Sequence, residues 1–118
     1  MIKAVPTAEV PQVWPDVKHW LEASPIFNKV ERQVAAGEYT LLLHPNGCAV
    51  VTKMPPNTMF IVEIGGKELV TDTGFKELCE YAKSVGSENI KAAATPAAAR
   101  LYRQIGMTTT HELMECVL

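Results

Sequence analysis

The sequence lacks the features that mark several large classes of protein. Its apolar runs, such as "MFIV" at residues 59–62, are far shorter than the roughly 20 residues that span a bilayer, and its opening residues do not form a signal-peptide pattern. Lysine and arginine are not clustered and the formal net charge is −2, so the basic surface that nucleic-acid binding requires is missing. We therefore expect a soluble, intracellular protein of the cytoplasm, with neither a membrane nor a nucleic acid as its partner.

Cysteine is scarce as well. The three cysteines, Cys48, Cys79 and Cys116, are odd in number and have no C-x-x-C spacing, which argues against both a disulfide framework and a zinc site. Each stands in an apolar run, so we expect buried and inert thiols. The three histidines are scattered without the spacing of metal ligands, and no metal is predicted.

The composition that remains is that of an ordinary globular domain. The chain has 118 residues, of which 47% are hydrophobic and 20% are charged. A chain of this length can bury roughly two thirds of the surface that it exposes when unfolded. We expect a single domain that spans residues 1–118.

Hydrophobic periodicity and turn residues predict an order of strands and helices. The expected elements are a strand at 1–5, a helix from 7 that Pro15 kinks or splits, a helix at 24–37 capped by Ser24, strands at 39–44 and 48–54 around a "PNG" turn, a strand at 58–64, a helix at 73–86, a strand at 89–94, a helix at 95–106 and a strand at 111–118. The strand–helix–strand unit at 59–94 implies a parallel pair of strands. Because Trp14 and Trp20 lie six residues apart, we expect one in the core and the other partly exposed.

The stretch "TPAAARLYRQIGM" at residues 95–107 carries the most specific motif. It resembles the late-helix motif N-x-x-A-x-x-L-Y-x-x-x-G-F of the GNAT superfamily of N-acetyltransferases. Four positions match in register: Ala98, Leu101, Tyr102 and Gly106. Thr95 stands where the family has Asn, and Met107 replaces the Phe. Because the order of elements is also similar, the resemblance covers essentially the whole chain.

The resemblance implies an α/β (α+β) fold, a GNAT-like mixed, mostly antiparallel sheet of about six strands with a central parallel pair and about four helices. It also implies acyl transfer from acetyl-CoA to an amine. In the family, the Tyr matched by Tyr102 often lies beside the thiol of coenzyme A, where it can act as a general acid. A carboxylate near the end of the central strand, matched by Glu63, can act as the base.

The same residues also have structural interpretations. Tyr102 can pack its ring on the sheet and point its hydroxyl at solvent or backbone, beside a buried Leu101. Glu63, the only charge in "TMFIVEI", can reach solvent or pair with Lys53 on the neighbouring strand. His44, just before the "PNG" turn, is a second candidate for the base, or else a surface histidine that flanks the turn.

The loop that should hold the pyrophosphate of coenzyme A departs from the family pattern R/Q-x-x-G-x-G/A. It reads "GGKELVTDTG" at residues 65–74, and Gly74 falls on the last small position. Val70 stands where a permissive backbone is needed. Asp72 places a carboxylate where the pyrophosphate would lie, so the two negative charges would repel each other.

A substitute cofactor site lies a few residues earlier. Gly65, Gly66 and Lys67 can form a phosphate cradle, with Lys67 as the cation. The backbone amides of Val62 and Ile64 are expected to hold acetyl-CoA beside them. The alternative is a plain loop that carries a surface lysine.

A degenerate loop beside a matching late helix resembles short phage-encoded GNAT-like proteins, including some internal virion proteins. The resemblance implies an N-acetyltransferase-like protein with weak or lost activity on an unknown amine, and the degenerate loop counts against acetyl-CoA as its cofactor. The alternative is a non-catalytic GNAT-fold interaction module, such as a phage virion or host-binding component with a protein partner. Either would act in the host cytoplasm or the virion if phage-encoded, and either is compatible with a homo-oligomer.

Overall fold

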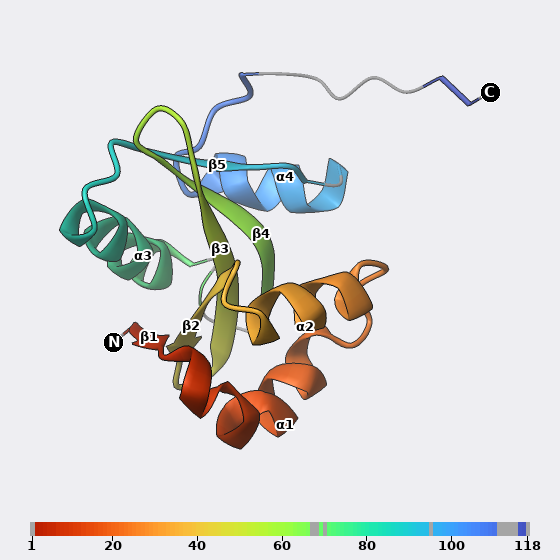
Figure 1. Ribbon diagram of the computed structural model, residues 1–118. Coiled ribbons are helices and arrows are strands. Elements are labelled where there is room, and N and C mark those ends of the chain that lie inside the picture. Colours follow the sequence, from red (N-terminus) through yellow and green to blue (C-terminus); the bar gives the residue numbers. More distant parts are fainter. Residues whose placement is uncertain (1, 67–68, 70, 95, 111–115, 118) are drawn as a thin grey trace.

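A five-stranded sheet forms the centre of the molecule (Figure 1). The computed structural model describes residues 2–66, 69, 71–94, 96–110 and 116–117. Within these residues the strands follow one another across the sheet in the order β1-β2-β3-β4-β5, which is also their order in the chain. Their bounds are Lys3–Val5 for β1, Thr40–His44 for β2, Gly47–Met54 for β3, Thr58–Gly66 for β4 and Asn89–Ala92 for β5.

The first four strands form an antiparallel meander, and β5 pairs with β4 in parallel. The hairpin predicted around the "PNG" turn is confirmed as the connection of β2 to β3. The predicted parallel pair is also confirmed, because Met59 lies opposite Ile90 and Ile61 lies opposite Ala92. The sequence pattern therefore identified two of the strand pairings correctly, that of β2 with β3 and that of β4 with β5.

The described sheet has five strands where about six were expected. The missing strand was predicted at residues 111–118, which lie outside the described residues except for Cys116 and Val117. These two residues are exposed and do not belong to a strand.

Four α-helices flank the sheet, as expected, and a short 3-10 helix, η1 (Thr7–Glu9), leads into the first of them. Their bounds are Val10–Leu21 for α1, Phe27–Ala35 for α2, Asp72–Ser84 for α3 and Pro96–Gln104 for α4. Pro15 lies inside α1 without splitting it. Because a proline has no N–H, the carbonyl of Pro11, four residues earlier, lacks its helical hydrogen bond. Both Pro11 and Pro15 are exposed, so water can donate to that carbonyl instead.

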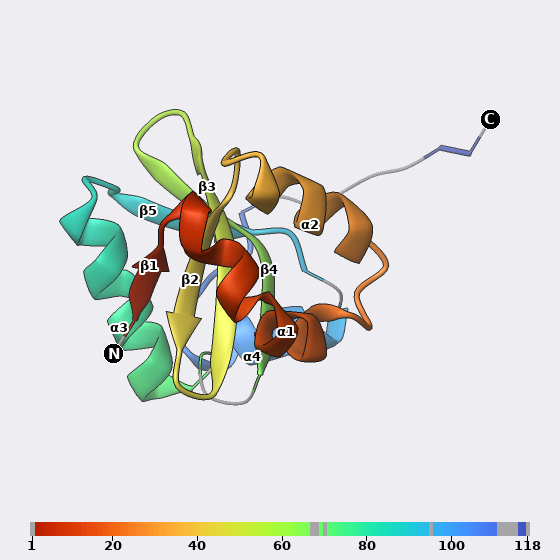
Figure 2. The ribbon, with the colours of Figure 1, turned by 60° about the horizontal axis from the view of Figure 1, so that its bottom comes forward.

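The helices divide between the two faces of the sheet. Figure 2 shows α1 in front of the strands and α4 behind them. Side chains alternate between the faces of a strand, so neighbouring residues such as Leu41 and Leu42 enter different cores. The first cluster, under α1 and α2, includes Val10, Val17, Leu21, Val30, Val34, Leu41, Cys48 and Val50. The second cluster, under α3 and α4, includes Leu42, Ala49, Met59, Ile61, Leu69, Leu78, Ala82 and Tyr102.

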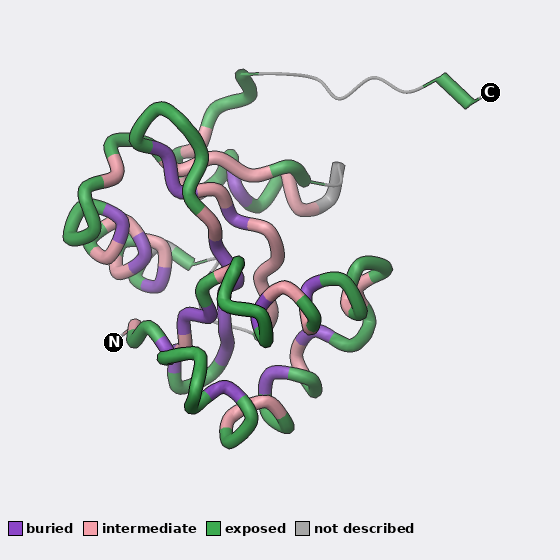
Figure 3. The backbone as a smooth tube through the Cα atoms, in the orientation of Figure 1, coloured by how far each residue is buried: buried purple, intermediate pink, exposed green. Residues whose placement is uncertain are grey.

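Burial follows the strands and the inner sides of the helices, as Figure 3 shows, and it corrects three expectations. Trp14 and Trp20 are both half-buried and both pack against the first cluster, so neither is simply core or surface. Leu101 is 50% exposed, whereas the next residue, Tyr102, is buried in the second cluster. Of the cysteines, Cys48 is buried as expected, but Cys116 is exposed.

Candidate functional site

A β-bulge interrupts β4 close to Glu63. Val50 of β3 lies opposite Glu63, whereas the next residue, Val51, lies opposite Ile61. Val62 is therefore an extra residue in β4 that has no counterpart on β3.

The bulge determines the face of the sheet toward which Glu63 points. Met59 and Ile61 pack in the second cluster, Val62 packs against the first, and Ile64 packs against the second again. In a regular strand Glu63 would follow Met59 and Ile61 and face α3 and α4. The extra residue turns Glu63 to the side of α1 and α2 instead.

On that side Glu63 finds a hydrogen-bond donor. The hydroxyl of Ser24, in the turn between α1 and α2, donates to Glu63 Oε2 at 2.6 Å. Lys53, the partner considered from the sequence, lies opposite Met59 in the strand register and is exposed. The ion pair of Glu63 with Lys53, one of the alternatives left open by the sequence, is therefore not formed. Ser24 was assigned only a capping role, and that assignment is wrong, because α2 begins at Phe27 without a side-chain cap.

β4 runs past the end of β5. Parallel pairing ends where Ile61 lies opposite Ala92, whereas β4 continues to Gly66 in contact with β3 alone. Among the described residues, no strand pairs with the β5 side of β4 beyond this point. The open stretch contains Val62 and Ile64, whose amides are the predicted cofactor ligands.

α4 brings Tyr102 to the same region. Its side chain is 8% exposed and packs in the second cluster. Burial, and to a smaller extent the negative charge of Glu63, raise the pKa of Tyr102 above its usual value of 10.0. Both effects disfavour the tyrosinate, so the phenol stays protonated at neutral pH. Ile64, the residue after Glu63 on β4, packs against the cluster that contains Tyr102, so α4 covers the face of the open stretch opposite to Glu63.

Gly65 and Gly66 are required by packing within the chain. A Cβ atom on Gly65 would lie 2.7 Å from Leu21 Cδ2 and 2.8 Å from the carbonyl oxygen of Trp20, both in α1. Gly66 has a φ of +88°, and a Cβ atom there would collide with the backbone of the β2–β3 turn. These contacts account for both glycines without a phosphate. Lys67, the third member of the predicted cradle, lies outside the described residues.

α3 begins close to the place where a pyrophosphate is expected. Thr71 is its N-cap residue, and Thr71 Oγ1 accepts the N–H of Gly74 at 3.1 Å. A helix N-terminus binds anions through N–H groups that have no partner within the helix, and this bond uses one of them. The first residue of the helix is the acidic Asp72. Val70 lies outside the described residues.

His44 connects β2 to α3. Its side chain is 8% exposed, its Nδ1 accepts the N–H of Asn46 at 3.3 Å, and its Nε2 lies 3.2 Å from Glu77 Oε2. Nδ1 is thus occupied by a backbone N–H, and Nε2 faces a carboxylate of α3. His44 is therefore neither the surface histidine nor the free base that the sequence suggested.

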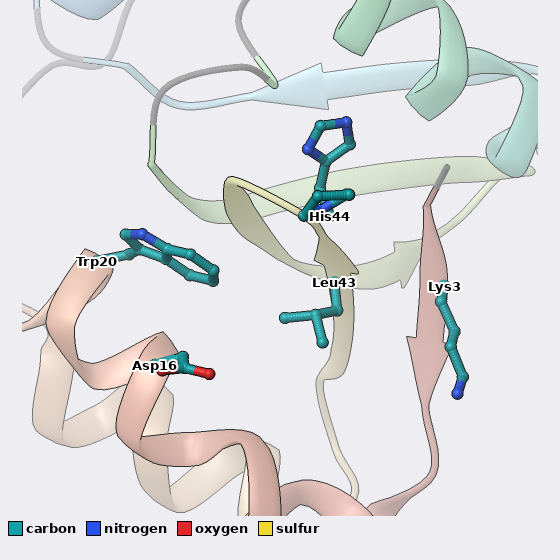
Figure 4. Close-up of a pocket in the computed structure, with 6 residues that line it drawn as sticks. Lys3, Asp16, Trp20, Leu43 and His44 are labelled. Atoms are coloured by element: carbon teal, nitrogen blue, oxygen red, sulfur yellow. The ribbon is translucent and has the colours of Figure 1, made fainter.

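A pocket of about 310 Å³ lies on the α1 side of the sheet, between α1, β1 and β2. It is lined by Lys3, Asp16, Trp20, Leu43, His44 and Pro45. Figure 4 shows Asp16 and Trp20 of α1 on one side and Lys3 on the other, with the ring of His44 pointing away from α1. Lys3, Leu43, Cys48 and Gly65 form one row across the strands, and α1 covers its Gly65 end. The pocket is the uncovered end of this row. Of the predicted site residues it contains only His44, the second candidate for the base.

Two kinds of feature are absent from the described part of the chain. No three histidine, cysteine or acidic side chains there are grouped so that they could hold a metal ion. No helix there is long and apolar enough to cross a membrane.

Comparisons with known proteins place the fold. Neither the protein-family models nor the curated proteins give a match. A ribosomal-protein-alanine N-acetyltransferase from Brucella melitensis biovar Abortus has a similar structure, with a TM-score of 0.72 at 12% identity, over 100% of this chain and 99% of that chain. An aminoglycoside N-acetyltransferase in complex with coenzyme A gives 0.65 at 9% identity, over 100% and 98%. An aminoglycoside acetyltransferase from an uncultured soil metagenomic sample, in complex with sisomicin, gives 0.66 at 10% identity, over 100% and 94%.

At these identities the likeness concerns the fold alone. These three proteins are acetyltransferases, and the match extends over the full length of the chain. The architecture expected from the late-helix motif is confirmed, and the chain has the GNAT N-acetyltransferase fold.

Proposed function

We propose that the protein is an N-acetyltransferase-like acyltransferase that transfers the acetyl group of acetyl-CoA to an amine. The observation that carries this proposal is the open stretch of β4 beyond β5, which contains Glu63 and whose Ile64 packs against the cluster that contains Tyr102. A carboxylate and a protonated phenol are the base and the acid that amine acylation needs. The acetyltransferases with the same fold support the reaction class.

The residues fit one end of acetyl-CoA better than the other. Beyond Ile61, the β5 side of β4 has no described strand partner, so its backbone groups suit the amide-containing arm of the cofactor. At the phosphate end, Thr71 already accepts the N–H of Gly74. We therefore expect weak binding. The residues proposed to hold the cofactor are Val62, Ile64, Gly65, Gly66, Lys67 and Gly74.

Bound acetyl-CoA would supply an acetyl group activated as a thioester. Glu63 would accept a proton from the ammonium form of the acceptor, because only the free amine has a lone pair for attack. Tyr102 keeps its own proton at neutral pH, since burial and the charge of Glu63 hold its pKa above 10.0. The amine would form the amide bond as the carbon–sulfur bond of the thioester breaks, and the buried hydroxyl of Tyr102 would donate its proton to the departing thiolate of coenzyme A.

Replacement of Tyr102 by Phe tests the proposal. Turnover is measured as the loss of thioester absorbance, with sisomicin or an alanine-terminated peptide as the acceptor. We expect Tyr102→Phe to lower turnover about 10²-fold, the scale of a lost general acid, with the melting temperature unchanged because the ring keeps its packing.

Tyr81→Phe is the matched control, because Tyr81 is a half-buried phenol on α3 whose pKa is also raised by burial. It should leave turnover unchanged. Equal turnover in wild type and Tyr102→Phe would remove the phenol from the mechanism.

A non-catalytic interaction module is the second candidate. It is favoured by the N-terminus of α3, where the N–H of Gly74 is occupied and Asp72 stands at the first position. Calorimetry and thermal denaturation with acetyl-CoA separate the two functions, because a ligand at ten times its Kd stabilises the native state by about 1.4 kcal/mol. If ~10 mM acetyl-CoA gives no heat of binding and no shift of the melting temperature, acyl transfer is excluded and the interaction module is favoured.

A further inference from the structure

The turn between α1 and α2 holds Ser24 firmly in place. Its N–H donates to the carbonyl of Leu21 at 2.9 Å, and its own carbonyl accepts the N–H of Phe27 at 3.1 Å. Ser24 is therefore tied to the end of α1 on one side and to the start of α2 on the other. Its side chain has little freedom to follow a partner that moves.

The direction of the bond to Glu63 follows from the second partner of the hydroxyl. Ser24 Oγ accepts the N–H of Ile26 at 3.3 Å, so its one proton is left for Glu63 Oε2 at 2.6 Å. A separation of this length is typical of a hydroxyl that donates to a charged carboxylate. The bond thus fixes one oxygen of Glu63, whereas Oε1 accepts no hydrogen bond from a residue that the structure describes.

A carboxylate at a bulge needs such support. Because Val62 and Glu63 both face α1 and α2, the side chain of Glu63 leaves the regular order of the strand, and its cross-strand partner, Val50, is apolar and cannot donate a hydrogen bond to it. Ser24 provides that orientation from a different element of the chain.

We propose that Ser24 is a positioning residue, whose hydroxyl holds Oε2 of Glu63 so that Oε1 faces the acceptor amine. This role rests on the proposed acyl transfer. It assigns to the α1–α2 turn a function in the reaction itself, through Glu63, in addition to its part in connecting two helices.

The test compares Ser24→Ala, which removes the donor, with Ser24→Thr, which keeps a hydroxyl. Ser84→Ala is the matched control, because Ser84 Oγ also makes a 2.6 Å hydrogen bond, to the carbonyl of Tyr81 on the exposed side of α3. We expect Ser24→Ala to lower kcat about tenfold with an unchanged KM for acetyl-CoA, since a lost support misplaces the base without touching the cofactor. Ser24→Thr should recover most of the activity, and Ser84→Ala should match the wild type.

The carbon NMR signal of the Glu63 carboxyl group gives a readout that does not depend on turnover. The signal is assigned by its loss in Glu63→Gln. We expect it to shift in Ser24→Ala, to stay near its wild-type position in Ser24→Thr, and to be unaffected in Ser84→Ala.

The two proposals fail in different ways. A wild-type protein that transfers no acetyl group to sisomicin or to the peptide, and binds no acetyl-CoA, refutes acyl transfer and the positioning role with it. An active wild type with the same kcat in Ser24→Ala, and an unmoved Glu63 signal, refutes the positioning role alone.

Discussion

Cys48 carries a thiol without exposed surface in the first cluster. Burial, and after it the negative charge of Glu63, raise the pKa of Cys48 from 9.0 to about 12, although a hydrogen bond from the backbone of Gly65 acts in the opposite direction. Between these two values the unfolded chain loses the thiol proton and the folded chain keeps it. The folded state therefore becomes less stable as the pH rises.

This difference predicts an alkaline loss of stability. The contribution of Cys48 is complete below pH 9.0 and falls as the pH rises toward 12, by at most about 1.4 kcal/mol per pH unit. Urea unfolding at a series of pH values measures the slope, which should be shallower in Cys48→Ala. Cys116→Ala, which removes an exposed thiol, is the control and should keep the wild-type slope. A wild-type slope in Cys48→Ala would contradict the assignment.

At the scale of the elements, the contact between α1 and β4 depends on a missing side chain. An alanine at position 65 would place its Cβ 2.8 Å from the carbonyl oxygen of Trp20, which is backbone and cannot rotate away. We expect Gly65→Ala to shift α1 and to lower the free energy of unfolding by about 1–3 kcal/mol, as overpacking does. The half-buried Trp20 should report the shift in its fluorescence.

Gly86→Ala is the control for that experiment. Nothing lies within 4 Å of the Cβ that an alanine at 86 would carry, and only the φ of +85° opposes it. It should cost about 1–2 kcal/mol from the backbone alone, without a change in tryptophan fluorescence. Gly65→Ala with wild-type stability and fluorescence would show that α1 does not touch Gly65.

The two helices behind the sheet, α3 and α4, each carry a leucine, and the two leucines differ in how much they contribute to stability. Leu78 of α3 is fully buried, whereas Leu101 of α4 is 50% exposed. We expect Leu78→Ala to cost about 2–5 kcal/mol and Leu101→Ala less than about 1 kcal/mol in chemical denaturation. A larger loss from Leu101→Ala would mean that α4 buries the other side of its surface.

The order of the elements could be predicted because it depends on local signals. Alternating and helical patterns, with a turn such as "PNG", are properties of short windows, and the parallel pair follows from one strand–helix–strand unit. The bulge could not be predicted, because Val62 resembles any apolar strand residue and is extra only relative to β3. The partner of Glu63 was missed for a related reason, since Ser24 lies in a distant turn and had a local capping role available.

The motif around Tyr102 predicted the position of a helix but not which of its side chains are buried. Its register placed Tyr102 correctly on the last described helix, but a linear motif does not state which of two neighbours faces the sheet. The predicted burial of Leu101 was therefore wrong, and the burial of Tyr102 was settled only by the packing of α4. Val62, Ile64, Gly65 and Gly66 were expected to bind a cofactor. Gly65 and Gly66 are also required by their contacts with α1 and with the β2–β3 turn.

At the scale of the whole molecule, the candidate site joins the two layers of helices through one strand. Ser24 reaches Glu63 from the side of α1 and α2, whereas Tyr102 comes from α4 on the other side of the sheet. The geometry of the site therefore depends on both hydrophobic clusters. A core substitution in either cluster should disturb it, even far from β4.

The described sheet ends in two strands, β1 and β5, that each pair on one side only. An open strand edge is a template for association with another chain, and a lysine on that edge opposes association because its charge would have to be buried. Lys3 on β1 and Lys91 on β5 stand in these positions.

We expect the double variant Lys3→Val with Lys91→Val to scatter light at concentrations where the wild type stays clear. The control, Lys53→Val with Lys76→Val, changes the net charge equally on β3 and α3 and should stay clear. In that case the charges of Lys3 and Lys91 prevent edge-to-edge pairing between copies of the chain. Any engineered form of this chain should therefore keep both lysines.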